Sequence, residues 1–107
     1  MNLNILDNME TFKDIINSDL PVLVDFFATW CGPCKTMTPI INDLGKDFHG
    51  RARILKIDVD KNQEVSNKYE IKGVPTFIIF KKGKVVWRDS GVMDKSVLVQ
   101  KLQDFTD

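Results

Sequence analysis

The chain has 107 residues, which is the size of a single domain spanning residues 1–107. Its 15 basic and 15 acidic side chains give a net charge of zero, which argues against partners such as nucleic acid or an anionic membrane surface. No apolar run approaches the roughly 18 residues of a membrane-spanning helix, and no basic and apolar secretory signal opens the sequence, so we expect a cytoplasmic protein.

The first part of the chain predicts two strands separated by a helix. Residues 3–6 form a short apolar run that is typical of a strand. A possible capping box of Asp7 and Glu10 then precedes apolar residues at helical spacing. Residues 20–27 are almost continuously apolar, which is typical of a central strand covered on both faces.

The middle of the chain predicts a long helix and another strand. Apolar residues at helical spacing run from residue 37 to 48, and Pro33 fits the first helical turn. Pro39 should kink this helix, and Gly50 is a plausible C-cap. Alternation of apolar and polar side chains over residues 53–59 indicates the strand.

The last part predicts a short helix at residues 62–69, a hairpin of strands 76–80 and 85–87, and a final helix at residues 94–105. Alternating strands and helices in the first half favour a parallel arrangement, and the hairpin adds antiparallel strands. The expected α/β fold is therefore a mixed sheet with helices on both sides.

The two cysteines, Cys31 and Cys34, stand where the central strand gives way to the long helix. A helix N-terminus favours negative charge, so the pKa of Cys31 should be lowered. Side chains three residues apart on a helix have Cβ atoms about 5–6 Å apart, and a small tightening allows the roughly 3.5–4.5 Å of a disulfide. We expect an exposed, attacking Cys31 and a buried, resolving Cys34. The alternative is a stable structural disulfide or two idle thiols.

Two further observations concern single residues. The one histidine, His49, lies 15 residues beyond Cys34, so we expect no metal site within the chain. Asp25 interrupts the apolar run of residues 20–27, where burial would raise the pKa of its carboxyl. The alternative is an edge aspartate that faces solvent.

The motif around the cysteines resembles the thioredoxin active-site signature: Trp30-Cys31-Gly32-Pro33-Cys34-Lys35. Further matches lie outside the motif: Asp25, Pro39, Gly73-Val74-Pro75-Thr76 and Gly91. The resemblance covers essentially the whole chain. It implies a thioredoxin-like fold, with a five-stranded mixed sheet flanked by four helices. It also implies thiol–disulfide exchange with no bound cofactor.

The resemblance assigns chemical roles to a few of these residues. Asp25 would take the proton from Cys34 during resolution, directly or through water. Lys56 would lie near this acid, although a solvated strand lysine is the plain alternative. The bond before Pro75 would be cis and face the cysteines, leaving the backbone of Val74 free to pair with an extended substrate.

The remaining matches form the expected substrate-binding rim. Trp30 would flank Cys31, with its indole N–H reaching Asp60. Four residues would complete the rim around the cysteines: Gly32, Pro33, Gly73 and Gly91. The glycines fit equally well as plain turn residues. The sequence departs from many bacterial members at Phe27, where they carry tryptophan, and at Ser90, a rim position that is apolar in some members.

The resemblance implies a general protein-disulfide reductant, because the dipeptide between the cysteines matches reducing members. Electrons would come from NADPH through a thioredoxin reductase. Expected clients are ribonucleotide reductase, methionine sulfoxide reductase and peroxiredoxins, and we expect a monomer. Two alternatives stay open: a disulfide oxidase or isomerase, and a binding subunit of a larger assembly without redox turnover.

Overall fold

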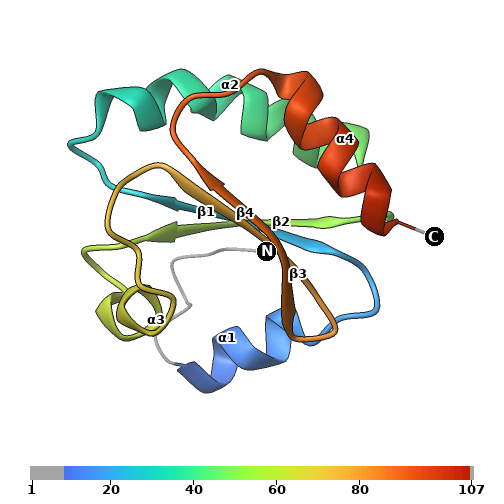
Figure 1. The fold of residues 1–107 in the computed structure, drawn as a ribbon, viewed down its shortest axis with the longest axis horizontal. Helices are drawn as coiled ribbons and strands as arrows, with labels where there is room; N and C mark the ends of the chain where they lie inside the picture. The colour runs from blue at the N-terminus through green and yellow to red at the C-terminus, as the bar shows by residue number, and fades with distance from the viewer. Residues whose placement is uncertain (1–8, 107) are drawn as a thin grey trace.

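Residues 9–106 of the computed structural model form three layers, with a β-sheet between two pairs of helices (Figure 1). The strands are β1 (Val22–Phe27), β2 (Arg53–Asp58), β3 (Thr76–Lys81) and β4 (Lys84–Ser90). The helices are α1 (Met9–Ile16), α2 (Gly32–Asp47), α3 (Gln63–Lys68) and α4 (Lys95–Phe105).

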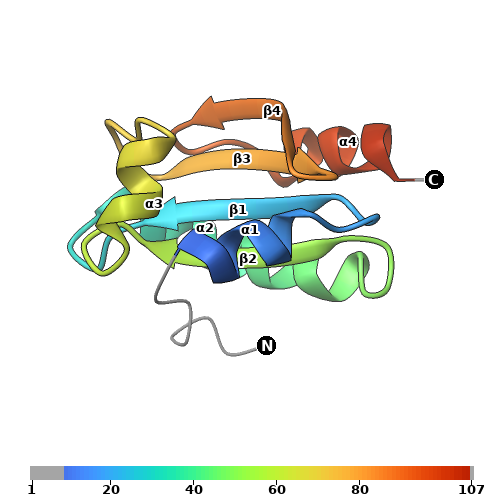
Figure 2. The same cartoon turned by 90° about the horizontal axis from the view of Figure 1, so that it is seen from below.

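The sheet has the strand order β2-β1-β3-β4, which Figure 2 shows with the strands side by side. β1 pairs in parallel with β2 and antiparallel with β3, and β3 pairs antiparallel with β4. The expected mixed sheet is confirmed, but it has four strands, not five, among the residues described. The strand predicted at residues 3–6 lies outside the described residues.

The central strand β1 is buried from both sides because helices cover both faces of the sheet. Val22, Val24 and Phe26 pack in the cluster that includes α1 and α3. Leu23 packs on the opposite face, in the cluster that includes α2 and α4. Asp25 follows Leu23 by two residues and therefore lies on the α2 face. This arrangement explains why the whole run is apolar except for one acid.

Helix α2 begins where the sequence predicts, with Pro33 in its first turn and Pro39 inside it. Its end differs from the prediction, because the helix ends at Asp47 and Phe48 is its C-cap. Gly50 follows with a φ of 81°, in the turn that leads into β2. The Phe48 side chain is buried and fixes this end of the helix against the core.

The hairpin predicted around Lys82-Gly83 is present, and both residues have positive φ angles of 53° and 83°. Two-residue hairpin loops with this geometry match the twist of the flanking strands. β4 is longer than predicted and reaches Ser90. Because β4 has only one neighbour in the described sheet and its side chains are mostly exposed, it lacks the apolar alternation that would reveal its length.

Candidate active site

Cys31 and Cys34 form a disulfide at the start of α2, just beyond the carboxyl end of β1. Their Cα atoms are 5.3 Å apart, within the usual range for disulfides. Cys31 is the N-cap residue, and its Sγ accepts a hydrogen bond of 3.1 Å from the backbone N–H of Cys34. The same helix N-terminus would therefore stabilise a thiolate on Cys31 after reduction.

The two cysteines do not differ in exposure as predicted. Cys31 is 3% exposed and Cys34 is 6% exposed, so the expectation of an exposed Cys31 is wrong for the disulfide form. The reason is a tertiary contact: Sγ of Cys31 lies 3.6 Å from the carbonyl oxygen of Val74, and Val59 and Val74 pack against the cluster of both cysteines. The two sulfurs differ instead in hydrogen bonding, because Sγ of Cys31 accepts a hydrogen bond from the backbone N–H of Cys34.

The Val74–Pro75 peptide bond is cis, as the resemblance predicts, and Val74 lies against the disulfide. The carbonyl oxygen of Pro75 accepts a 2.9 Å hydrogen bond from the N–H of Gly91. Gly91 has a φ of 92°, which favours glycine, so its role as a turn residue is sufficient to explain it. A side chain at Gly73 would meet no atom within 4 Å, so the space in front of this loop is open.

Side-chain hydrogen bonds hold this loop in place, and the sequence did not point to them. Oγ1 of Thr76 donates to the carbonyl oxygen of Gly73 over 2.6 Å and lies 3.0 Å from Oγ of Ser90. Arg88 of β4 donates to the carbonyl oxygens of Tyr69 and Glu70, at the start of the same loop. Thr76 could have been found from its place directly after the proline, but nothing in the sequence marks Arg88.

Asp25 is 2% exposed, which excludes the alternative of an edge aspartate facing solvent. Burial raises the pKa of its carboxyl to about 6, and the charge of Lys56 lowers this pKa in part. The strand register places Asp25 opposite Lys56 on β2 and Phe77 on β3. Its Oδ1 has no hydrogen-bond partner among the residues described, so this oxygen is available to take up a proton.

A cavity of about 200 Å³ lies beside Cys34. Its lining includes Phe27, Cys34 and Lys56. Lys56 is half-buried, and its Nζ lies 5.1 Å from the centre of the Phe27 ring. Lys56 therefore differs from a plain solvated lysine: it lies opposite the buried acid in the strand register and lines the cavity beside Cys34. Phe27 thus keeps an aromatic contact at a position where many bacterial members carry tryptophan.

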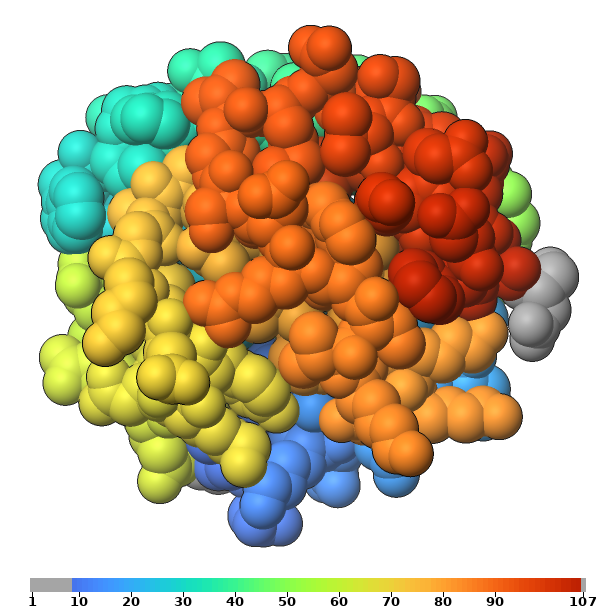
Figure 3. Space-filling view, in the orientation of Figure 1, coloured from blue at the N-terminus to red at the C-terminus, as the bar shows by residue number. Residues whose placement is uncertain are grey.

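The exposed rim around the disulfide is largely apolar. Trp30 is 69% exposed, and its Nε1–H donates to Oδ2 of Asp60 over 2.9 Å, as the resemblance predicts. Gly32 and Pro33 are exposed on the first turn of α2. On the face in Figure 3, the start of α2 (teal) lies beside the loop that carries Val74 (yellow).

A groove of about 340 Å³ runs from Trp30 along this loop. Its lining is Trp30, Val59, Ile71, Lys72, Gly73 and Val74. The predicted rim residues Trp30, Gly73 and Val74 are therefore brought together on one surface. Ile71 and Lys72 were missed, because neither belongs to a motif.

Residues 9–106 provide neither a metal centre nor a membrane span. No three or more histidine, cysteine, aspartate or glutamate side chains in this part of the chain are grouped to hold a metal ion. None of the helices described combines the length and the apolar character needed to cross a bilayer.

A family model described as Thioredoxin matches residues 4–104. The chain belongs to the thioredoxin family. A relative named thioredoxin from Rickettsia felis is 42% identical over 87 residues, which cover 81% of this chain and 83% of the relative. The chloroplastic thioredoxin Y1 of Arabidopsis thaliana is 43% identical over 96 residues, which cover 89% of this chain but 56% of the relative. The chain thus spans little more than half of that relative.

Solved thioredoxin structures resemble this fold closely. A mutant thioredoxin from Halobacterium salinarum superposes with a TM-score of 0.85 at 33% identity, covering 94% of this chain and 88% of that one. Thioredoxin from Plasmodium falciparum gives a TM-score of 0.82 at 36% identity, covering 92% and 94%. The thioredoxin-like fold and the cysteine pair at disulfide distance are thus found together, as the sequence predicts.

Proposed function

We propose that this thioredoxin-family chain is a general protein-disulfide reductant that works by dithiol–disulfide exchange. The observation that carries the proposal is the Cys31–Cys34 disulfide at the N-terminus of α2, facing the open loop of Gly73 and Val74. A structural staple would gain little from so short a ring, since closing a four-residue loop contributes roughly 2 kcal/mol.

In the first step the Cys31 thiolate attacks one sulfur of a client disulfide. A mixed disulfide forms between Cys31 and the client, and the second client sulfur leaves as a thiolate. The backbone N–H of Cys34, which points at Sγ of Cys31, and the N-terminus of α2 stabilise the attacking thiolate. The apolar groove from Trp30 to Val74 would hold the extended client segment.

In the second step Cys34 loses its proton to Asp25 and attacks Sγ of Cys31. The mixed disulfide breaks, the client leaves fully reduced, and the two electrons lost by the cysteine pair now reside in the client thiols. Burial keeps the pKa of Asp25 near 6, close enough to neutral pH for the carboxylate to serve as a base. Lys56 then stabilises the carboxylate form of Asp25.

The proposed partners are those that the resemblance to the thioredoxin family implies. A thioredoxin reductase would return two electrons from NADPH to the disulfide. The proposed clients are ribonucleotide reductase, methionine sulfoxide reductase and peroxiredoxins. One similar solved structure supports the last class: it comes from work on thiol resolution in a yeast mitochondrial 1-Cys peroxiredoxin by glutathione and thioredoxin systems, with 30% identity and a TM-score of 0.83. We also propose a monomer located in the cytoplasm.

Two cysteine variants test the proposal. Cys31→Ser removes the attacking sulfur and should abolish turnover of a protein disulfide with a reductase and NADPH. Cys34→Ser should instead accumulate a covalent mixed disulfide between Cys31 and the client, visible by mass spectrometry after acid quenching. Turnover that persists in Cys31→Ser, or a Cys34→Ser variant that traps no client, would contradict the proposed mechanism.

A further inference from the structure

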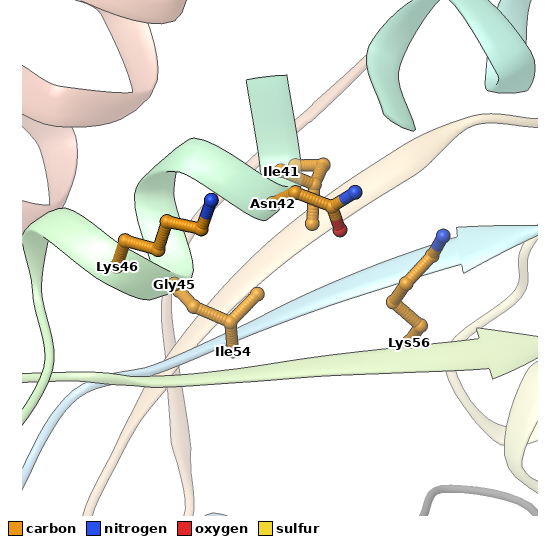
Figure 4. A pocket seen from close by; sticks show the side chains of 6 residues that line it. All are labelled: Ile41, Asn42, Gly45, Lys46, Ile54 and Lys56. Carbon is orange, nitrogen blue, oxygen red and sulfur yellow. The ribbon is translucent and has the colours of Figure 1, made fainter. Parts of the chain in front are cut away.

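A groove lies between the second half of α2 and strand β2, away from the rim around the disulfide (Figure 4). Its volume is about 390 Å³. Its lining residues are Ile41, Asn42, Gly45, Lys46, Ile54 and Lys56. Small-molecule sites commonly have volumes of roughly 300–1,000 Å³, mostly apolar walls and a few polar groups. The groove therefore has the volume of such a site, and its lining combines two isoleucines with two lysines.

The charges of the groove favour an anion. Two lysines line it and no carboxylate does. The nearby acids of α2 are held by α4, because Nζ of Lys95 lies 2.7 Å from Oδ2 of Asp47 and 4.0 Å from Oδ2 of Asp43. Neither Lys46 nor Lys56 forms an ion pair with any residue from 9 to 106.

Lys56 connects this groove to the cavity at the resolving cysteine. In Figure 4 its side chain rises from β2 toward α2. Lys56 lines the groove and also lines the cavity of about 200 Å³ that includes Cys34. Its position opposite Asp25 in the strand register brings its charge close enough to lower the pKa of that carboxyl.

Among the groups around Asp25, Lys56 is the one whose charge lowers the pKa of this carboxyl. On β3, Asp25 is paired with the uncharged Phe77. On β2, Asp58 faces the same side as Lys56 but has its Oδ1 bound to the N–H of Asp60. α2 covers this face with buried, uncharged side chains, among them Cys34, Met37 and Ile41. Its charged residue at the cavity that Lys56 also lines is Lys35, but the charge that lowers the pKa of Asp25 is that of Lys56.

We infer that the α2–β2 groove binds a small organic anion with an apolar body, and that the bound anion acts on Asp25 through Lys56. The head group would pair with Lys56, Lys46 would add a second positive charge at the other end of the groove, and the apolar body would rest on Ile41 and Ile54. The negative charge offsets the field of Lys56 at Asp25, so the pKa of Asp25 rises further above its ordinary value.

The coupling must be reciprocal, because two linked binding events change each other's affinity by the same factor. The anion therefore binds more tightly when Asp25 is protonated, and its affinity falls as the pH rises through about 6. One consequence rests on the proposed function: an occupied groove leaves less carboxylate at neutral pH and slows resolution by Cys34.

Hexanoate, with a carboxylate and a short alkyl body, is a suitable probe for the oxidised full chain. We expect its amide NMR shifts to concentrate at residues 41–46 and 54–56, and acetate and hexanol to bind more weakly. The pKa of Asp25, followed by the ¹³C signal of its carboxyl, should rise when hexanoate saturates the groove. This readout needs no turnover, so it stands or falls independently of the proposed reductase activity.

Lys46→Glu should weaken hexanoate binding by about fivefold, because an exposed ion pair contributes up to about 1 kcal/mol and the glutamate replaces attraction with repulsion. Lys84→Glu is the matched control, since it makes the same charge change on the exposed hairpin and should leave the affinity within about twofold. Equal weakening by both variants would overturn the inference. So would hexanol binding as tightly as hexanoate, or an Asp25 titration that saturating hexanoate does not move.

Discussion

Asp25 shows how one residue links stability and chemistry in this protein. The fold buries a carboxyl that has no hydrogen-bond partner for Oδ1 among the residues described, and the resulting cost appears as a pKa of about 6 instead of 3.8. Such a site is poor for stability and good for accepting a proton near neutral pH. Two predictions follow from the same residue and require different measurements.

The first prediction concerns stability. Because the pKa of Asp25 is raised in the folded state, its unfavourable contribution is absent below about pH 3.8 and grows until the pH passes about 6. Asp25→Asn removes this titrating group and should therefore stabilise the protein at pH 8. The gain in the free energy of unfolding over the wild type should be up to ~3 kcal/mol larger at pH 8 than at pH 3.5. Urea unfolding of the oxidised protein across this pH range measures the difference.

Asp14→Asn is the control for this experiment, because Asp14 lies exposed on α1 and loses the same charge. It should show no comparable gain at pH 8. The contrary result is a difference in the free energy of unfolding between Asp25→Asn and the wild type that stays constant from pH 3.5 to pH 8. That result would show that burial does not shift the pKa of Asp25.

The second prediction concerns the order of steps. Asp25→Asn should slow release of the client from the mixed disulfide more than it slows attack by Cys31, because in the proposed mechanism only resolution uses this base. In the wild type the release rate should rise as the pH passes about 6, and this rise should be lost in the variant. Rapid-mixing kinetics with a labelled client disulfide separates the steps, and equal slowing of both would count against Asp25 as the base.

At the scale of elements, the helices on the α2 face contribute many buried side chains to the core, and α4 is an example. Leu98 and Leu102 are fully buried on this helix, whereas Val97 is 38% exposed. Leu98→Ala should lower the free energy of unfolding by about 2–5 kcal/mol, the range for a buried leucine that leaves a cavity. Val97→Ala should change it by less than about 1 kcal/mol. Urea unfolding compares the two, and similar losses would contradict the packing described for α4.

The elements were largely predictable because their patterns depend on near neighbours in the sequence. The apolar run at residues 20–27 predicted a strand covered on both faces, and its lone acid predicted a buried carboxyl. The burial of Cys31 was not predictable, since the cover comes from Val74, 43 residues away. The contacts of Arg88 with the loop before Val74 depend likewise on tertiary structure, and the exposed side chains of β4 concealed its length.

At the scale of the whole molecule, the three layers explain where the site lies. The parallel pair β1 and β2 ends at the same edge, and open α/β sheets carry their sites at such edges. α2 starts there with Cys31, and the loop before β3 returns to the same edge with Val74. The disulfide and the apolar groove of Trp30 and Val74 therefore lie together at this edge of the sheet, where the proposed disulfide exchange would take place.

The reduction potential of the Cys31–Cys34 pair tests the proposed reductant role most directly. Equilibration with a thiol buffer, followed through the fluorescence of Trp30 and Trp87, gives the value. A protein that reduces client disulfides should have a reduction potential of about −270 mV, the value typical of thioredoxin. A potential near about −120 mV, typical of a strong disulfide oxidant, would contradict the reductant role and assign the site to oxidation of client thiols instead.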